Sequence, residues 1–209
     1  GSDIVRQAIA ILDSGVGGLT VAKEVMRQLP QEEIVYFGDT GRAPYGPRAA
    51  DEVLRFTEQI VDYLLQFNPK MIVIACNTAT AIALHHIRSQ VDIPVVGVIQ
   101  PGSRAAIKAT KTGFIGVIGT ENTIASGAYP RSLLAINPNA RVVSLACPSL
   151  VPIVEKRMYR SEEAGQAVWK SLQPLLGSPI DCLILGCTHY PFLAPIISKV
   201  LGPRVAIIS

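Results

Sequence analysis

Residues 183–191 read LILGCTHYP, an apolar run that leads directly into a glycine, a thiol, a hydroxyl, an imidazole and a phenol. Residues 72–79, IVIACNTA, repeat this pattern: an apolar run, a small residue, a cysteine, and then polar residues suited to a helix start. Short apolar runs of this length are typical of buried strands. The two stretches therefore predict two similar half-molecules, each with one thiol, Cys76 or Cys187, at the end of a strand.

Six further apolar runs do not alternate with polar residues, a pattern that favours strands of a parallel sheet covered on both faces. Strand and helix patterns follow one another along the chain, so we predict an α/β fold of two similar domains with mainly parallel sheets. We place the domains at 1–98 and 99–209, with 99–102 as the linker. The predicted strands are 8–12, 34–37, 71–75, 95–98, 114–118, 142–145, 182–185 and 205–208. The predicted helices are 19–29, 49–67, 78–89, 103–109, 123–135, 162–176 and 192–201.

Composition argues against several classes of partner. The 209 residues are 49% apolar and carry a formal charge of +3, with no basic run of five, so we expect no nucleic-acid partner. No apolar stretch reaches the roughly 18 residues of a membrane-spanning helix, and we expect no membrane partner. The N-terminus shows no secretory pattern, and the four cysteines form no CxxC pair. We therefore expect reduced thiols and a cytoplasmic location.

The polar residues that follow the predicted strands are candidates for a site, because ligands of open α/β sheets bind beyond the carboxyl ends of strands. Cys76 and Cys187 each precede residues that suit a helix N-terminus, where the helix dipole and unpaired N–H groups favour a thiolate. A thiol in that setting is a base as well as a nucleophile. We expect Asp13 and His189 nearby as auxiliary acid–base groups.

One thiol from each half fits a reaction that is symmetric about a carbon centre. One group removes a proton from one face and the other delivers a proton to the opposite face, as in racemisation or epimerisation. Helix starts and the backbone amides of residues 14–18 could hold a substrate carboxylate. The side chains expected to help are those of Asn77, Thr78, Thr120 and Thr188.

Six segments in chain order resemble the cofactor-independent glutamate racemases, which make D-glutamate for bacterial peptidoglycan. They are LDSGVGGLTV (12–21), GDTGRAPYG (38–46), ACNTATA (75–81), VIGTENT (117–123), ACPSLVPIVE (146–155) and LGCTHYP (185–191). The resemblance implies an active site in a cleft between two α/β domains, a homodimer, and neither cofactor nor metal. It also implies that members continue past the position of Ser209, so that part of the first domain's cover would be missing here.

The resemblance assigns roles residue by residue. Cys187 would deprotonate L-glutamate and Cys76 D-glutamate, with Asp13 and His189 as auxiliary acid–base residues. Acidic residues also implicated in the family match Asp39 and Glu155. The substrate-binding positions match Ser14, Pro44, Tyr45, Gly46, Asn77, Thr78, Thr120 and Thr188.

Other interpretations remain open at this point. A related racemase could act on aspartate or a hydantoin, a Cys–His hydrolase or transferase could form an acyl intermediate on one thiol, and a truncated chain could bind glutamate without turnover. The Cys187–His189 spacing does not match a zinc site. Cys147 and Cys182 are expected to be structural, because free cysteine is among the most buried residue types. We expect His85 and His86, in mid-helix, to be no metal ligands.

Overall fold

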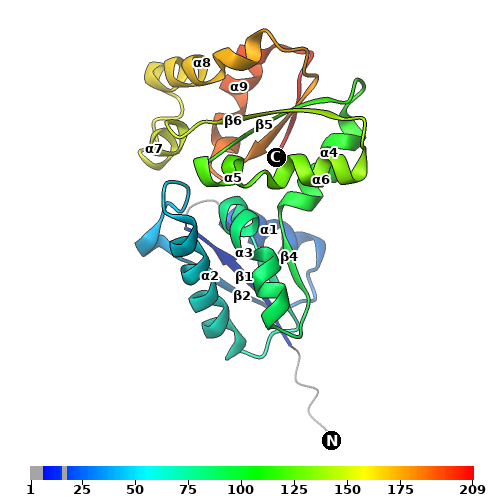
Figure 1. Ribbon diagram of the computed structural model, residues 1–209. Helices are drawn as coiled ribbons and strands as arrows, with labels where there is room; N and C mark the ends of the chain where they lie inside the picture. Colours follow the sequence, from blue (N-terminus) through cyan, green and yellow to red (C-terminus); the bar gives the residue numbers. More distant parts are fainter. Residues whose placement is uncertain (1–6, 16–17) are drawn as a thin grey trace, which may run out of the picture. The chain divides into compact units, whose positions relative to one another are not determined.

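The computed structural model describes residues 7–15 and 18–209. The chain divides into two compact units, Gly1–Val98 and Ile99–Ser209 (Figure 1). Each unit is built on a four-stranded parallel sheet with helices packed against it. The predicted fold class, two α/β domains with parallel sheets, is confirmed.

Unit 1 has the strand order β2-β1-β3-β4, and each neighbouring pair is parallel. Its strands are β1 (Ile9–Asp13), β2 (Ile34–Gly38), β3 (Met71–Ile74) and β4 (Val95–Gly97). Its helices are α1 (Gly18–Gln28), the 3-10 turn η1 (Thr40–Arg42), α2 (Ala50–Leu65) and α3 (Asn77–Gln90).

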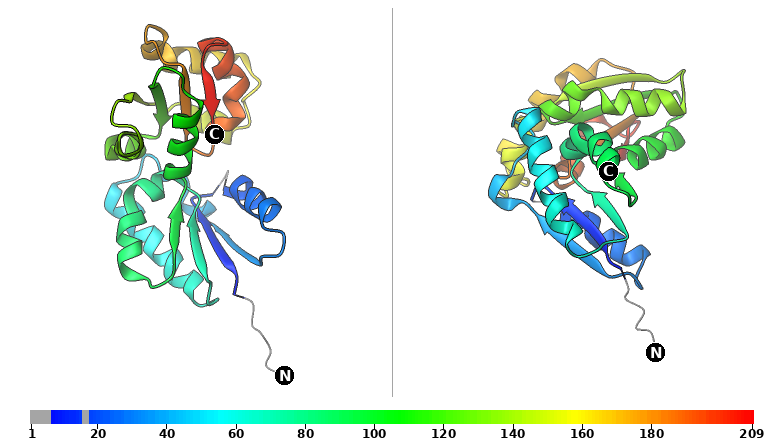
Figure 2. Two further views of the ribbon diagram at one scale, coloured as in Figure 1. Left: turned by 90° about the vertical axis from the view of Figure 1, so that its right-hand side faces the viewer. Right: turned by 60° about the horizontal axis from the view of Figure 1, so that its bottom comes forward.

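The central strand β1 is apolar at successive positions because both of its faces are covered. Ala10 and Leu12 belong to the core shared with α2 and α3, whereas Ile9 and Ile11 belong to a second core that includes Ala22 of α1. The left view of Figure 2 shows these helices on opposite faces of the sheet. Alternate side chains of a strand point to opposite faces, so a strand covered on both sides must be apolar at every position.

Unit 2 has the strand order β6-β5-β7-β8, again parallel throughout. Its strands are β5 (Phe114–Gly119), β6 (Arg141–Ala146), β7 (Cys182–Gly186) and β8 (Ala206–Ile208). Its helices are α4 (Ile99–Ala109), α5 (Glu121–Ser126), α6 (Ala128–Ile136), α7 (Leu150–Glu155), α8 (Glu162–Leu176), the 3-10 turn η2 (Tyr190–Leu193) and α9 (Ala194–Leu201). Figure 1 shows α7, α8 and α9 on one face of this sheet and α4 and α6 on the other.

The two sheets have one topology, since β5 to β8 take the places of β1 to β4 in the strand order. The repeat expected from the two cysteine stretches is therefore confirmed at the level of the fold. Cys76 follows β3 and Cys187 follows β7, so the two thiols occupy equivalent positions in their units.

Three expectations about local structure are wrong. Residues 99–102 form no linker but the first turn of α4, where Pro101 is tolerated because the first turn needs no N–H donor. The helix expected at 123–135 is divided into α5 and α6 by Gly127, whose φ of +66° ends α5 in the left-handed conformation. The six-residue helix α7 lies where no helix was expected.

Candidate active site

Cys76 lies at the carboxyl end of β3 and is the N-cap residue of α3. Its Sγ accepts a hydrogen bond from the backbone N–H of Ala79 at 3.4 Å. The backbone N–H of Thr78 and the side chain of Ser14 also hydrogen-bond to this thiol. The predicted placement of Cys76 at a helix start is confirmed, and the end of β1 provides Ser14 beside it.

The acidity of Cys76 differs from the expectation. Burial raises the pKa of its thiol to about 11, and the nearby carboxylate of Asp13 raises it further, against the lowering effect of the hydrogen bonds from Ser14, Ala79 and Thr78. Desolvation disfavours the charged form of any buried group. The hydrogen bonds at the helix start lower the pKa of Cys76 as predicted, but burial raises it by more. In the protein without substrate Cys76 is therefore a neutral thiol.

Asp13 is fully buried at the end of β1, and its Oδ2 accepts a hydrogen bond from the N–H of Gly15 at 2.9 Å. The hydroxyl of Tyr36 in β2 donates to the carbonyl oxygen of Gly15 at 3.3 Å and feels the charge of Asp13. Burial and the Asp13 charge raise the pKa of Tyr36 to about 12. Tyr36 is not among the predicted site residues, because only the β1–β2 register, which pairs it with Ile11, brings it here.

The segment after β2 carries the other predicted residues of unit 1. Asp39 and Tyr45 are buried, and the Tyr45 hydroxyl donates to Asp39 Oδ2 at 2.5 Å. Burial and the Asp39 carboxylate raise the pKa of Tyr45, and Cys76 contributes in the same direction. Tyr45 and Cys76 belong to the same hydrophobic core. Pro44 is half-buried and Gly46 is buried.

Asn77 and Thr78, the first residues of α3, are buried next to Cys76. Unit 1 therefore brings Asp13, Ser14 and these two residues together around the thiol. The expected amide cradle at residues 14–18 includes Val16 and Gly17, which lie outside the described residues.

Cys187 directly follows β7, and its Sγ lies 3.6 Å from Nδ1 of His189. On the other side of the ring, Nε2 lies 3.3 Å from Oε1 of Glu155, the last residue of α7. This second contact is electrostatic, since Nε2 is not aligned for a hydrogen bond to the carboxylate. Burial lowers the pKa of His189, and the charge of Glu155 opposes that shift. The ring is therefore neutral at neutral pH.

Cys187 does not lie at an α-helix N-terminus, which corrects the expectation that a helix starting at Thr188 tunes this thiol. A turn at 187–189 leads into η2, and α9 begins only at Ala194. Pro191 gives the physical reason, because an α-helix starting here needs the N–H of residue 191 to donate to the carbonyl oxygen of Cys187, and proline has none. The N–H of Tyr190 donates to that oxygen instead, at 3.0 Å, which makes a turn. His189, and not a helix dipole, is the group beside Cys187.

Thr120 follows β5, as Cys187 follows β7, and the two strand ends are adjacent because Gly119 pairs with Gly186. Thr120 is the N-cap of α5, with its hydroxyl accepting from the N–H of Thr123 at 3.4 Å. Thr188 is half-buried in the turn after Cys187.

Tyr190 is also not among the predicted site residues, although it lies inside the LILGCTHYP stretch. It is fully buried, and its hydroxyl donates to the carbonyl oxygen of Cys147 at 3.0 Å. Its backbone N–H donates to the carbonyl oxygen of Cys187 at 3.0 Å, and burial and the two cysteines raise the pKa of its hydroxyl. Cys147 and Cys182 are both buried free thiols, in agreement with the structural role expected for them.

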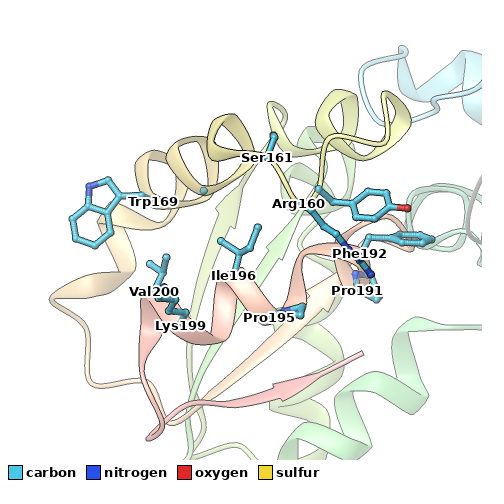
Figure 3. A pocket seen from close by; sticks show the side chains of 11 residues that line it. Arg160, Ser161, Trp169, Pro191, Phe192, Pro195, Ile196, Lys199 and Val200 are labelled. Carbon is cyan, nitrogen blue, oxygen red and sulfur yellow. The ribbon is translucent and has the colours of Figure 1, made fainter.

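A groove of about 930 Å³ lies on unit 2, and Pro191 and Phe192, which follow Tyr190 in the chain, are among the residues that line it. Figure 3 shows Trp169 of α8 and Ile196 and Val200 of α9 along it, with Phe192 at one end. None of the predicted site residues lines it. Within residues 7–15 and 18–209, no group of three or more His, Cys, Asp or Glu side chains could hold a metal ion. The helices of the described chain include none that is long and apolar enough to cross a membrane.

Comparison with known proteins places these residues in a family. A family model of Asp/Glu/hydantoin racemases matches residues 18–209. A glutamate racemase of Bacillus cereus is 55% identical over 205 residues, which are 98% of this chain and 76% of that protein. A glutamate racemase structure from Bacillus anthracis has a TM-score of 0.94 at 52% identity, covering 97% of this chain and 76% of the other. A glutamate racemase from Francisella tularensis, in complex with D-glutamate, has a TM-score of 0.91 at 36% identity over 98% of this chain and 76% of that chain.

Proposed function

Since this chain belongs to the Asp/Glu/hydantoin racemase family, we propose that it interconverts L- and D-glutamate by proton transfer at the α-carbon. The observation that carries the proposal is the equivalent placement of two thiols, Cys76 after β3 and Cys187 after β7. A hydrolase or transferase that uses one nucleophilic thiol leaves the second one unexplained. The relatives named glutamate racemase favour glutamate over aspartate or a hydantoin as substrate.

The first step takes the α-proton of L-glutamate. We propose that the Cys187 thiol passes its proton to Nδ1 of His189, 3.6 Å away, and then removes the α-proton as a thiolate. A neutral ring can accept at Nδ1 only if its own proton is on Nε2, and the Glu155 carboxylate 3.3 Å from Nε2 favours that tautomer. Glu155 then stabilises the imidazolium that forms.

The second step delivers a proton to the opposite face of the carbanion. Cys76 is suited to this step because burial raises the pKa of its thiol to about 11 and keeps it protonated. Transfer of its proton gives D-glutamate and leaves the Cys76 thiolate, which the hydrogen bonds from Ser14, Ala79 and Thr78 stabilise. In the reverse direction this thiolate is the base and Cys187 the acid. Asp13, whose charge acts on Cys76, is the auxiliary residue of this half.

The proposal assigns substrate binding to polar and backbone groups around the two thiols. In unit 2 they are Thr120 and Thr188. In unit 1 they are Ser14, Pro44, Tyr45, Gly46, Asn77 and Thr78. The proposal includes a reaction without pyridoxal phosphate or metal, since two thiols supply both base and acid. It also includes a cytoplasmic homodimer whose product serves peptidoglycan synthesis.

Proton NMR of L- and D-glutamate in D₂O, without added cofactor, tests the proposal. The wild type is expected to remove the α-proton signal of both enantiomers. Cys187→Ala should exchange only the α-proton of D-glutamate, and Cys76→Ala only that of L-glutamate, because each retains one base. Cys182→Ala removes a buried thiol outside the proposed site and is the matched control.

The remaining outcomes separate the alternatives. A folded protein without exchange, whose melting temperature D-glutamate raises, would support binding without turnover. A folded protein with neither exchange nor a shift in melting temperature would contradict the assignment of glutamate. An acyl adduct on one cysteine, detected by mass spectrometry, would support the nucleophilic interpretation.

A further inference from the structure

Arg42, in the 3-10 turn η1, makes an unusually complete set of contacts for a partly exposed loop residue. Its Nε donates to Asp39 Oδ2 at 2.6 Å and its Nη1 donates to Gln59 Oε1 at 2.6 Å. Its guanidinium lies 3.9 Å from the centre of the Phe56 ring. Gln59 and Phe56 belong to α2, so one side chain ties the loop after β2 to this helix.

We propose that Arg42 is a positioning residue, which acts through Asp39 and Tyr45 to hold the segment 44–46 in the shape that binds substrate. The inference rests on the proposed function, which assigns Pro44, Tyr45 and Gly46 to substrate binding. Arg42 itself has no assigned role in that reaction.

The first link is the shared oxygen of Asp39. Its Oδ2 accepts from the Tyr45 hydroxyl at 2.5 Å and from Arg42 Nε at 2.6 Å. Asp39 is only 7% exposed, and a buried carboxylate requires charged or hydrogen-bonding partners. Hydrogen bonds to an ionised acceptor are about twice as strong as neutral ones. The guanidinium therefore stabilises the carboxylate that fixes Tyr45.

The second link anchors the guanidinium to α2. A planar guanidinium can stack flat on an aromatic ring while its in-plane N–H groups donate in two directions, whereas an ammonium group has no flat face to stack. Arg48 completes the anchor: its Nε donates to the carbonyl oxygen of Arg42 at 2.8 Å, and its guanidinium lies 5.2 Å from the same Phe56 ring. The side chain and the backbone of Arg42 are thus both held, and Tyr45 is held through them.

Loss of the Arg42 contacts is expected to weaken substrate binding more than it slows proton transfer. The Tyr45 hydroxyl donates to Asp39, so in this arrangement it serves to place the ring and the backbone of 44–46. Without Arg42, Asp39 keeps its bond to Tyr45 but loses its connection to α2, and the segment becomes less ordered. A looser binding segment must be ordered when substrate binds, which raises KM, while the thiols and His189 keep their own contacts.

The test compares Arg42→Ala and Arg42→Lys with Arg55→Ala in kinetics with both enantiomers. Arg55 lies 5.9 Å from the same Phe56 ring and is exposed, so its loss removes an equal charge without touching the link to Asp39. Arg42→Ala should raise KM for L- and D-glutamate about tenfold, the equivalent of about 1.4 kcal/mol of binding, with kcat little changed. Arg42→Lys should recover part of the loss, and Arg55→Ala should match the wild type.

Hydrogen exchange of the folded variants gives a readout that does not depend on turnover. The amides of Tyr45 and Gly46, the two residues of this segment that carry a backbone N–H, should exchange faster in Arg42→Ala than in the wild type and in Arg55→Ala, with the rest of the chain unchanged. Equal exchange in all three, or a fall in kcat at constant KM, would overturn the positioning role. A wild type that exchanges no α-proton would contradict the proposed function itself, and the exchange of 44–46 would still decide the role of Arg42.

Discussion

The two thiols have different immediate neighbours. Cys76 has a carboxylate nearby and accepts backbone hydrogen bonds at the start of α3, whereas Cys187 lies in a turn beside an imidazole. A group near a carboxylate is biased toward its protonated form, and a thiol beside a neutral imidazole has a proton acceptor within reach. At the scale of single residues the site is therefore asymmetric, although the fold is a repeat, and each half is expected to respond differently to substitution.

Removal of the His189 ring should affect the two half-reactions unequally. In His189→Asn, exchange of the α-proton of L-glutamate should fall by about 10² to 10⁴-fold, the usual contribution of a general base. Exchange of the α-proton of D-glutamate, which begins at Cys76, should be retained. Net racemisation must fall equally in both directions, because no catalyst shifts an equilibrium, so exchange followed by NMR is the informative measurement.

His86→Asn is the matched control for this prediction. His86 lies on α3, contacts Glu58 at 3.0 Å and is not part of the proposed site. It should leave both exchange rates unchanged. An equal loss of exchange with both enantiomers in His189→Asn would contradict the assignment of His189 to Cys187 alone.

In the wild type, exchange of the α-proton of L-glutamate should decline as the pH falls below about 6.5, since burial lowers the pKa of His189 and protonation of the ring removes the proton acceptor of Cys187.

The acidity of Cys76 predicts a loss of stability at alkaline pH. Its pKa is about 11 in the folded protein against 9.0 ordinarily. Below pH 9 the thiol is protonated in both the folded and the unfolded state, and its contribution to the free energy of unfolding is fully present. Between pH 9 and 11 only the unfolded chain releases the proton, so the protein becomes less stable as the pH rises. At about 1.4 kcal/mol per pH unit the loss approaches about 3 kcal/mol.

Thermal melts of the wild type and Cys76→Ala at about pH 8 and about pH 10.5 measure this contribution. The variant should lose less stability than the wild type over this interval. Burial also raises the pKa of Cys147 and of Cys182, so both proteins are expected to lose some stability. An identical loss in the two would mean that Cys76 has an ordinary pKa in the folded state.

At the scale of the element, the end of β7 is fitted closely against β5. A Cβ added at Gly186 would lie 2.6 Å from the carbonyl oxygen of Ile118 and 3.1 Å from the Tyr129 ring. A backbone oxygen in a sheet cannot move away as a flexible side chain can. Because Gly186 directly precedes Cys187, any displacement of the strand is passed to the thiol.

Gly186→Ala is expected to lower the free energy of unfolding by about 1–3 kcal/mol, the usual cost of overpacking, and to reduce exchange of the α-proton of L-glutamate. Gly165→Ala in α8 is the control, because a Cβ there meets nothing within 4 Å. It should stabilise the protein by about 0.5–1 kcal/mol through helix propensity. Denaturant melts measure both changes, and a neutral Gly186→Ala would show that β5 and β7 can separate without cost.

The strands could be predicted from the sequence because a strand that is buried on both faces is apolar at nearly every position. All eight predicted strands are present, each with ends within two residues of the expected ones. Helix ends could not be predicted as well, because they depend on single backbone conformations, such as that of Gly127, and on the restriction that Pro191 imposes before α9. The environment of Cys76 could not be predicted either, since burial is set by the whole sheet and outweighs the local effect of a helix start.

At the scale of the whole molecule, the order β2-β1-β3-β4 in unit 1 and its repetition in unit 2 explain which site residues the sequence reveals. The central strands β1, β3, β5 and β7 end at, or one or two residues before, the polar residues that the sequence pattern singles out. These residues are Asp13-Ser14, Cys76, Thr120 and Cys187. The pattern does not identify Tyr36 or Arg42. Tyr36 is placed by a strand register and Arg42 by contacts with α2, and neither relation is visible along the chain.

The proposed reaction uses one thiol from each unit, and it therefore predicts that substrate changes the hydrogen exchange of both units. Saturating D-glutamate, at about 100 times its dissociation constant, should stabilise the protein by about 2.7 kcal/mol. Hydrogen exchange should slow both around Cys76 and Thr78 and around Cys187 and Thr188. Slowing in only one unit would show that the other thiol does not take part in binding, and the two-thiol proposal would then fail even if one enantiomer still exchanged its α-proton.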